Sequence, residues 1–219
     1  MVINFYTTMS SFQIRHATYD DMDSVVAIHL RCFPDYFLSK LGSRFLKRYY
    51  QSFLDTCRDN SDPFNQFFVG ISGDLLIQGY VCGTTDMNIT LSKFYRINLL
   101  QLLFIVLRQI IYCPNLGIDV LYRVINFLKS KLASHVKLPI AVVMPSATLC
   151  AIAVDQVSRG SNMAAMLVQR FGDGMKSAGI KTLYLYVKAE NARAKAFYKK
   201  INWECVLPNS ALQCWIKSL

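Results

Sequence analysis

Two segments near the C-terminal end decide the fold: Val154–Ala164, VDQVSRGSNMA, and Asn191–Trp203, NARAKAFYKKINW. The first follows an apolar run at Ala147–Val154, which is typical of a strand, and leads into a helical pattern at Asn162–Ala178. The second follows an alternating strand pattern at Lys181–Val187. This order of strand, turn, helix, strand and helix predicts a chain of mixed α/β class.

The turn before the helix has the properties of an anion site. The first N–H groups of a helix have no partner inside it, and the positive end of the helix dipole lies behind them. Gly160 lets a ligand approach the backbone, and Arg159 adds a full positive charge. The turn therefore indicates a pyrophosphate site, although an ordinary strand-to-helix turn has the same outline.

The two segments together resemble the GNAT superfamily of N-acetyltransferases. The family pattern V-x-x-x-x-R-G-x-G-x-A corresponds to Val154–Ala164, and N-x-x-A-x-x-F-Y-x-K-x-G-F/W corresponds to Asn191–Trp203. The resemblance implies an α/β (α+β) fold from about Phe12 to Leu219. Its central sheet would be mixed, mostly antiparallel, flanked by helices and splayed between the fourth and fifth strands.

The resemblance also implies a domain organisation. We expect one domain over residues 1–219, with a lead-in at 1–11, an extra helical hairpin at 87–145 between the third and fourth strands, and a cofactor core at 146–204. The implied co-substrate is acetyl-CoA, without a metal. Tyr198 would protonate the leaving thiolate, because a phenol can act as a general acid. The implied cofactor-binding residues are Ile152, Ala153, Val154, Arg159, Gly160, Ser161, Asn162, Met163, Ala164, Asn191 and Tyr198.

The sequence departs from the family pattern at three positions. Val157 stands where the family has Gln or Arg, and Asn162 and Asn202 each replace a glycine. Asparagine tolerates the left-handed backbone better than other residues with a side chain, so Asn202 can serve its turn. A side chain at Asn162 could crowd the pyrophosphate, which leaves open an inactive member of the family.

The base that removes the amine proton is not evident. Family members often carry a Glu near the position of Thr148, but no carboxylate is present there. Asp86, at the end of a predicted strand, is our candidate catalytic residue beside Tyr198, and His29 is the second candidate. Either side chain could instead be structural.

The N-terminal half has its own alternating and helical patterns. Thr18 is a predicted cap for a helix that starts near Tyr19, and Ser72–Asp74 is a hairpin turn. The other predicted elements are a strand at Phe12–Ala17, a helix at Phe37–Cys57 and strands at Gln66–Ile71 and Leu75–Thr84.

The segment 87–145 is apolar and basic. It predicts helices at Lys93–Cys113 and about Ile118–Leu132, and residues 93–137 hold seven Lys or Arg and one Asp, a net +6. The apolar run Ile97–Cys113 has 17 residues and contains Arg108, whereas a membrane span needs about 20 with few such groups. Either the two predicted helices pack on the sheet and shape the acceptor pocket, or they lie on an anionic membrane surface.

Composition narrows the class of protein. The 219 residues carry a net +10, and the seven cysteines form no C-x-x-C pair, which argues against a disulfide framework or zinc site. We expect reduced thiols in a cytoplasmic protein, peripheral at the inner membrane face if the basic hairpin binds lipid. The start of the chain lacks the pattern of a signal peptide. More than half of the excess charge lies on apolar helices, which argues against a nucleic-acid-binding protein. The sequence does not decide the oligomeric state, and a homodimer is one alternative.

The acceptor side is less informative. Phe33–Gly42, Gly83–Asp86 and the basic insertion resemble an uncharacterised bacterial GNAT subgroup that is often associated with surface-polysaccharide genes. This resemblance implies a small-molecule amine, such as an amino sugar or sugar nucleotide, as the acceptor. The alternatives are a protein or peptide N-acetyltransferase and a catalytically weak acyl-CoA-binding module.

Overall fold

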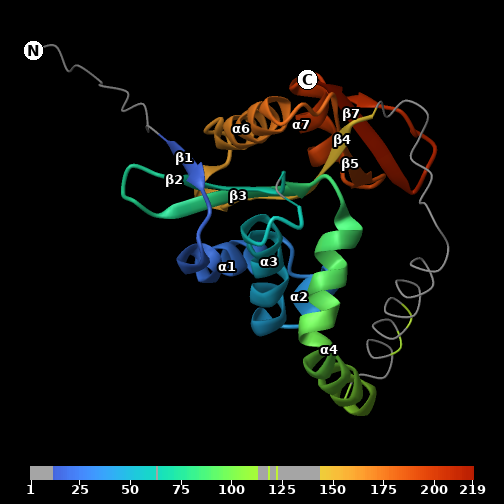
Figure 1. Ribbon diagram of the computed structural model, residues 1–219. Coiled ribbons are helices and arrows are strands. Elements are labelled where there is room, and N and C mark those ends of the chain that lie inside the picture. The colour runs from blue at the N-terminus through green and yellow to red at the C-terminus, as the bar shows by residue number, and fades with distance from the viewer. Residues whose placement is uncertain (1–11, 63, 113–117, 119–121, 123–143) are drawn as a thin grey trace, which may run out of the picture.

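A seven-stranded sheet lies between two layers of helices (Figure 1). The computed structural model describes residues 12–62, 64–112, 118, 122 and 144–219. The strand order is β1-β2-β3-β4-β5-β7-β6. The strands are β1 (Gln13–His16), β2 (Gln66–Ile71), β3 (Ile77–Thr84), β4 (Ser146–Val154), β5 (Thr182–Lys188), β6 (Glu204–Cys205) and β7 (Leu212–Ser218).

The pairing of β4 with β5 is parallel, and every other pairing in the described sheet is antiparallel. The two strands pair only between Ser146–Thr148 and Thr182–Tyr184, whereas β4 continues along β3 to Val154 and β5 continues along β7 to Lys188. The sheet therefore opens between β4 and β5 after three residue pairs. This confirms the predicted mixed, mostly antiparallel and splayed sheet.

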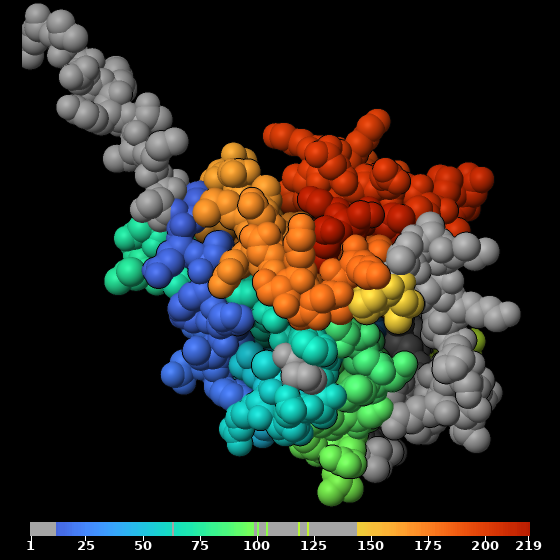
Figure 2. All heavy atoms as spheres, turned by 45° about the horizontal axis from the view of Figure 1, so that its top comes forward, coloured from blue at the N-terminus to red at the C-terminus, as the bar shows by residue number. Residues whose placement is uncertain are grey.

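Helices cover both faces of the sheet. In Figure 1, α1 to α4 lie below the sheet, and α6 and α7 lie above it. The helices are η1 (Tyr19–Asp21), α1 (Met22–Cys32), α2 (Phe37–Lys40), α3 (Ser43–Arg58), α4 (Met87–Tyr112), η2 (Gln156–Ser158), α6 (Met163–Ser177) and α7 (Ala192–Lys200). Figure 2 shows the C-terminal part of the chain, orange to red, as a continuous surface above the blue and green N-terminal part.

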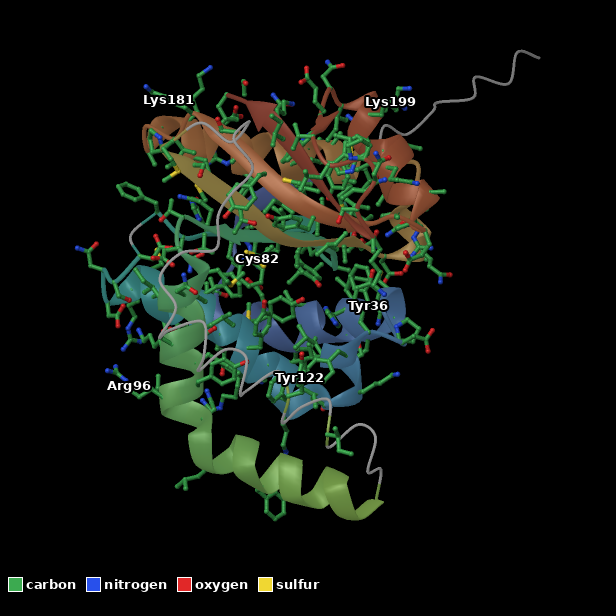
Figure 3. The ribbon with its side chains drawn as sticks, turned by 90° about the vertical axis from the view of Figure 1, so that its right-hand side faces the viewer. Tyr36, Cys82, Arg96, Tyr122, Lys181 and Lys199 are labelled. Carbon is green, nitrogen blue, oxygen red and sulfur yellow. The ribbon has the colours of Figure 1, made fainter. Side chains whose placement is uncertain are left out.

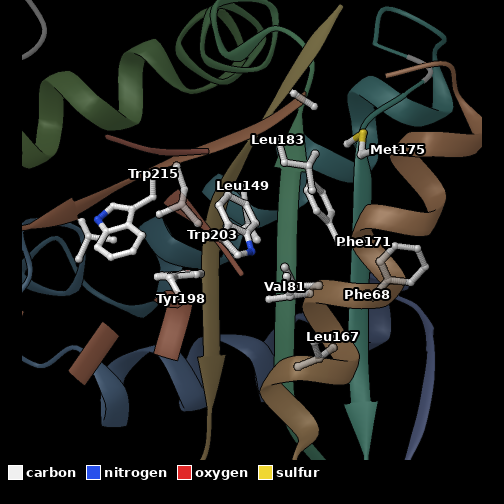
Figure 4. Packing of buried hydrophobic residues seen from close by; sticks show 14 of the residues in the cluster. Phe68, Val81, Leu149, Leu167, Phe171, Met175, Leu183, Tyr198, Trp203 and Trp215 are labelled. Carbon is white, nitrogen blue, oxygen red and sulfur yellow. The ribbon is translucent and has the colours of Figure 1, made fainter. Parts of the chain in front are cut away.

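Each face of the sheet has its own apolar core. On the upper face, Leu167, Phe171 and Met175 of α6 pack against Phe68 and Val81 (Figure 4). Their spacing of four residues places them on one side of the helix. The core on the other face is built from residues of α1, α3, β2, β3 and β4, including Val25, Leu46, Phe53, Val69 and Tyr80. These two cores fix the position of β4, whose residues contribute to both.

Three predicted elements have different limits in the structure. The single helix predicted at Phe37–Cys57 is wrong, because α2 and α3 are separated at Gly42, which has a φ of 91°. The strand predicted from Leu75 starts at Ile77, since Leu75 takes a left-handed φ of 63° in the hairpin. The helix predicted from Lys93 starts at Met87.

The first half of α4 packs on α3. Phe94 lies edge-on to Phe45 and Tyr49, with ring centroids 5.2 and 5.9 Å apart, and Lys93 Nζ donates to the Asp55 carbonyl at 2.8 Å. Exposed apolar side chains follow at Ile97, Leu100 and Phe104. The predicted helix at Ile118–Leu132 lies almost wholly outside the described residues. Across the described helices, none combines the length and apolar character that crossing a bilayer requires.

Candidate active site

A cavity of about 1040 Å³ opens where β4 and β5 separate. Its walls come from β4, the turn before α6, β5, α7 and the end of α1 with the loop that follows. The cavity therefore connects three features that the sequence placed apart: the Gly160 turn, the Tyr198 helix and the segment that starts at Phe33.

The turn from Asp155 to Asn162 forms one end of the cavity. Gly160 has a φ of 84°, and a Cβ atom added there would meet nothing within 4 Å, so the space beside this backbone is free. Asn162 precedes the first residue of α6 and takes a left-handed φ of 68°. It therefore adopts the backbone conformation that a glycine would supply. Val157 is 79% exposed and does not line the cavity.

The edge of β4 forms the floor of the cavity. Cys82 pairs with Ala151 and Gly83 with Leu149, which leaves Cys150 as an extra residue in a β-bulge. Beyond Thr148, β4 has no pairing with β5, so the backbone groups on that edge lack ladder partners. Ile152, Ala153 and Val154 belong to this free edge and line the cavity. Bulges disrupt strand pairing locally and are over-represented next to active sites.

The α7 wall contains Asn191 and Tyr198. Asn191 caps the helix, since its Oδ1 accepts a hydrogen bond from the Ala194 N–H at 3.0 Å. Tyr198 is 5% exposed and packs beside Trp203 and Trp215, with ring centroids 5.4 and 6.4 Å away (Figure 4). Its hydroxyl makes no hydrogen bond with the described residues, and burial raises the pKa of the phenol. Tyr198 thus stays protonated at neutral pH.

Comparison with known proteins identifies this arrangement. Residues 138–203 match the model of the acetyltransferase (GNAT) family. The fold is similar to that of SsHAT, at 19% identity over 95% of this chain and 98% of that one, with a TM-score of 0.63. The chain has the GNAT fold. The family match within this fold identifies an acyltransferase.

Two further structures share this fold. PaiA N-acetyltransferase from Thermoplasma acidophilum, solved in complex with coenzyme A, is 13% identical over 95% of this chain and 99% of that one, with a TM-score of 0.60. Ribosomal-protein-alanine N-acetyltransferase from Brucella melitensis is 15% identical over 94% and 99%, with a TM-score of 0.55. No curated protein matches the sequence. All three likenesses are below 25% identity, so they show the fold alone, and a fold does not select the acceptor.

Within the GNAT fold, the cavity gathers most of the residues predicted to bind the cofactor. Ser161 is the exception, because it does not line the cavity and its hydroxyl donates to the Ser158 carbonyl. The predicted residues that do line the cavity are Ile152, Ala153, Val154, Arg159, Gly160, Asn162, Met163, Ala164, Asn191 and Tyr198. Their assignment to acetyl-CoA stays a prediction.

Asp86, the predicted catalytic carboxylate, lies outside the cavity. Its carboxylate accepts a hydrogen bond from the Asn88 N–H at 2.8 Å, and its own N–H donates to Thr84 Oγ1 at 3.1 Å. These contacts organise the start of α4. The structure therefore brings Tyr198 to the cavity but not Asp86, whereas the second candidate, His29, is one of the lining residues.

The aromatic end of the cavity combines the predicted segment Phe33–Gly42 with side chains that the sequence analysis did not single out. Tyr49 and Tyr50 of α3 and Lys188 of β5 line it with Phe33 and Tyr36. The Lys188 ammonium lies 5.1 Å from the centroid of the Tyr36 ring, a cation–π contact. Figure 3 shows Tyr36 at the boundary between the sheet and the helical layer. These contacts join residues more than 100 positions apart, so no local sequence pattern predicts them.

Proposed function

We propose that this acyltransferase moves the acetyl group of acetyl-CoA to the amine of a small molecule. The observation that carries the proposal is the continuous cavity from the Gly160 turn, past Tyr198, to the aromatic end at Tyr36. An anion site, a splayed strand edge and an aromatic end within one cavity are the three parts that a reaction between a CoA thioester and a second substrate requires.

The residues present fit acetyl-CoA. The turn offers free N–H groups at the start of α6 and an open approach at Gly160, and Arg159 adds positive charge, which suits a pyrophosphate. The free edge of β4 at Ile152–Val154 suits the amide groups of the pantetheine arm, because these can complete the missing ladder. Acetyl-CoA, when bound, supplies an activated thioester. Backbone N–H groups at the Cys150 bulge are the candidate donors to the developing oxyanion.

Tyr198 is the candidate donor to the departing sulfur. Its hydroxyl has no hydrogen-bond partner among the described residues, so it is free to donate. Burial raises the pKa of Tyr198 above its usual value, whereas a thiol has a pKa of about 8.5. Complete proton transfer from the phenol to a thiolate is therefore unfavourable at equilibrium. The phenol stabilises the thiolate as a hydrogen-bond donor, and the proton follows from solvent.

A small acceptor fits the aromatic end better than a polypeptide. A peptide substrate needs an open groove beside the reacting carbonyl, but the contact between Tyr36 and Lys188 joins the two walls there. The resemblance to polysaccharide-associated proteins favours an amino sugar or a sugar nucleotide. Acetylation of a protein N-terminus and a non-catalytic acyl-CoA-binding module are the competing functions.

Release of CoA thiol from acetyl-CoA tests the proposal. The protein is incubated with acetyl-CoA and a panel of amines: glucosamine, amino-sugar nucleotides, alkylamines and peptides with free N-termini. We expect the highest kcat/KM for a sugar amine and a large loss in Tyr198→Phe. A peptide as the preferred substrate would contradict the small-molecule assignment. Tight acetyl-CoA binding without thiol release for any amine would identify a binding module instead.

A further inference from the structure

Three buried polar groups form a closed cluster beside the aromatic end of the cavity. His29 of α1 is 4% exposed, and Tyr50 of α3 and Tyr80 of β3 are fully buried. His29 Nδ1 lies 2.7 Å from the Tyr50 hydroxyl and 3.1 Å from the Tyr80 hydroxyl, and the two hydroxyls are 2.7 Å apart. Helices α1 and α3 and strand β3 are therefore linked through one imidazole nitrogen, Nδ1 of His29.

The hydrogen count of this cluster determines the tautomer of His29. Tyr80 can donate to Tyr50, and Tyr50 can donate to Nδ1, so both phenol protons are used if Nδ1 carries none. If Nδ1 carried the ring proton, one of the two phenol protons would have no acceptor within the cluster. Burial raises the pKa of both phenols and lowers the pKa of His29 to about 4, so all three groups are neutral at pH 7. The network thus assigns the ring proton to Nε2.

The Nε2 atom of His29 is left without a partner. It is buried and makes no hydrogen bond with any described residue, although the imidazole belongs to the cavity wall. A buried N–H without an acceptor costs about as much as a lost hydrogen bond, and folded proteins seldom keep one without a reason. Phe33, whose ring centroid lies 5.2 Å from the imidazole, is an aromatic neighbour in the cavity wall, and Tyr36 and Tyr49 also line the cavity.

The charges of the cavity restrict the acceptor further. The charged side chains among its described lining residues are Arg159, Lys188, Arg193 and Lys200, all of them cations. A protonated amine would therefore meet no counter-ion in this wall, and burial of an unpaired charge is unfavourable. The acceptor amine has to enter neutral, which favours an amine of low basicity. Aromatic walls suit the face of a ring.

We propose that the Nε2–H group of His29 positions the acceptor by donating a hydrogen bond to one of its oxygen atoms, and that this acceptor is a weakly basic ring amine bearing hydroxyl groups. Amino sugars have this chemistry, since their hydroxyl groups lower the basicity of the neighbouring amine. The proposal rests on the proposed acetyl transfer and names its acceptor class. His29 is a positioning residue here. Because Nε2 is buried, the acceptor displaces part of the wall, and Phe33, whose ring centroid is 5.2 Å from the imidazole, is the side chain to move.

Two substitutions separate this function from a purely structural one. In His29→Asn, the short amide can accept from Tyr50 at the position of Nδ1 but has no donor at the position of Nε2. In His29→Gln, the longer amide restores a donor near Nε2. With D-glucosamine as the probe, we expect His29→Asn to raise KM for glucosamine about tenfold with KM for acetyl-CoA unchanged, and His29→Gln to recover most of that loss. If His29→Asn kept the wild-type KM for glucosamine and His29→Gln raised it, the cluster would have a structural role only.

A measurement without turnover decides the same question. The sequence holds three histidines, so ring-¹⁵N-labelled protein and the His29→Asn variant assign the His29 signals. We expect a neutral ring protonated at Nε2, whose signal shifts with glucosamine but not with cyclohexylamine, a more basic ring amine without oxygen. A ring protonated at Nδ1, or no response to glucosamine, overturns the proposal. Calorimetry with CoA tests the proposed function, because a protein that does not bind CoA contradicts it. The glucosamine titration is run with and without CoA. The titration without CoA therefore tests the role of His29 even if the proposed function fails.

Discussion

Arg31 Nε donates to Asp155 Oδ2 at 3.0 Å, and this contact joins the end of α1 to the start of the turn from Asp155 to Asn162. A second contact, from Arg159 Nη2 to Cys32 Sγ at 3.8 Å, links the same two segments. Desolvation acts to raise the pKa of Asp155, but the hydrogen bond and charge of Arg31, together with the backbone N–H groups of Gln156 and Val157, hold the pKa below its usual value. The helix that carries His29 is therefore connected to the turn that would hold the pyrophosphate.

Replacing Arg31 should weaken acetyl-CoA binding more than folding. In Arg31→Ala, the turn loses its tie to α1, and we expect KM for acetyl-CoA to rise about fivefold, or about 1 kcal/mol, because Arg31 acts on the cofactor only through the turn. The Arg31 side chain is 53% exposed, so the free energy of unfolding should change by less than about 1 kcal/mol. Steady-state kinetics and urea unfolding measure the two effects. Lys47→Ala, which breaks an exposed ion pair with Asp23, is the control and should change neither.

The left-handed backbone at Asn162 predicts opposite results for two small residues. Alanine there should lower the free energy of unfolding by about 1 kcal/mol, because it resists a positive φ, whereas glycine should leave it unchanged or raise it. We also expect Asn162→Gly to keep the Kd for CoA within about threefold, and Asn162→Ala to weaken it more. Urea unfolding and calorimetry with CoA measure both. Equal stability of the two variants would contradict the backbone argument.

Tyr198→Phe tests the donor to the leaving thiolate. We expect kcat to fall about 10- to 100-fold with little change in either KM, since the hydroxyl acts on charge that develops in the transition state. Thermal stability should hold, because the hydroxyl has no hydrogen bond to lose among the described residues. Because its raised pKa keeps the phenol protonated, ionisation of Tyr198 should not lower kcat as the pH rises to about 9. Tyr19→Phe, which removes a hydroxyl bonded to Asp55, is the matched control. An unchanged kcat in Tyr198→Phe would remove this residue from the chemistry.

Local patterns predicted the part of the site that is local in the chain. The turn at Gly160, the helix that follows Asn191 and the strand Gln66–Ile71 follow from spacing within one segment, and the last has its predicted bounds. The break at Gly42 was missed because the apolar pattern continues from Leu38 through Leu41, so the periodicity hides the one residue that takes a positive φ.

Contacts between distant segments could not be predicted in this way. His29 is 21 positions from Tyr50 and 51 from Tyr80, and only the packing of α1 and α3 on β3 brings them together. The available signal was weak: Tyr50 lies on the apolar side of the amphipathic helix α3, and Tyr80 lies in the mostly apolar strand β3. A buried hydroxyl at either position needs a partner. Asp86 shows the converse, since a carboxylate at a strand end looks catalytic in the sequence but organises the next helix.

Gly83 should be the least tolerant glycine in the sheet. A Cβ atom added there would collide with the Thr148 carbonyl and come within 2.7 Å of Phe171 Cε2, so α6 could not keep its place over β3 and β4. We expect Gly83→Ala to lower the free energy of unfolding by about 3 kcal/mol or to prevent folding. Gly73→Ala, in the exposed hairpin where nothing lies within 4 Å, is the control. Denaturant unfolding measures both, and similar stabilities would contradict the close packing of α6.

Asp21 should make the stability of the N-terminal region depend on acid pH. Desolvation acts to raise its pKa, but hydrogen bonds from Arg15 at 2.6 and 2.7 Å and from the Thr18 N–H at 2.7 Å hold the pKa below its usual value. A carboxylate with a lowered folded pKa stabilises the protein above the unfolded pKa, about 3.9, and this contribution disappears as the pH falls towards the folded value.

Asp21→Asn should therefore cost about 2 kcal/mol at pH 7, since it leaves the Arg15 charge without a partner, and the difference from wild type should shrink below about pH 4. Urea unfolding at about pH 7, 5 and 3.5 follows the change. Asp23→Asn, at an exposed carboxylate paired with Lys47, is the matched control and should stay within about 0.5 kcal/mol at each pH. A cost for Asp21→Asn that is the same at all three pH values would show that the carboxylate charge does not stabilise this turn.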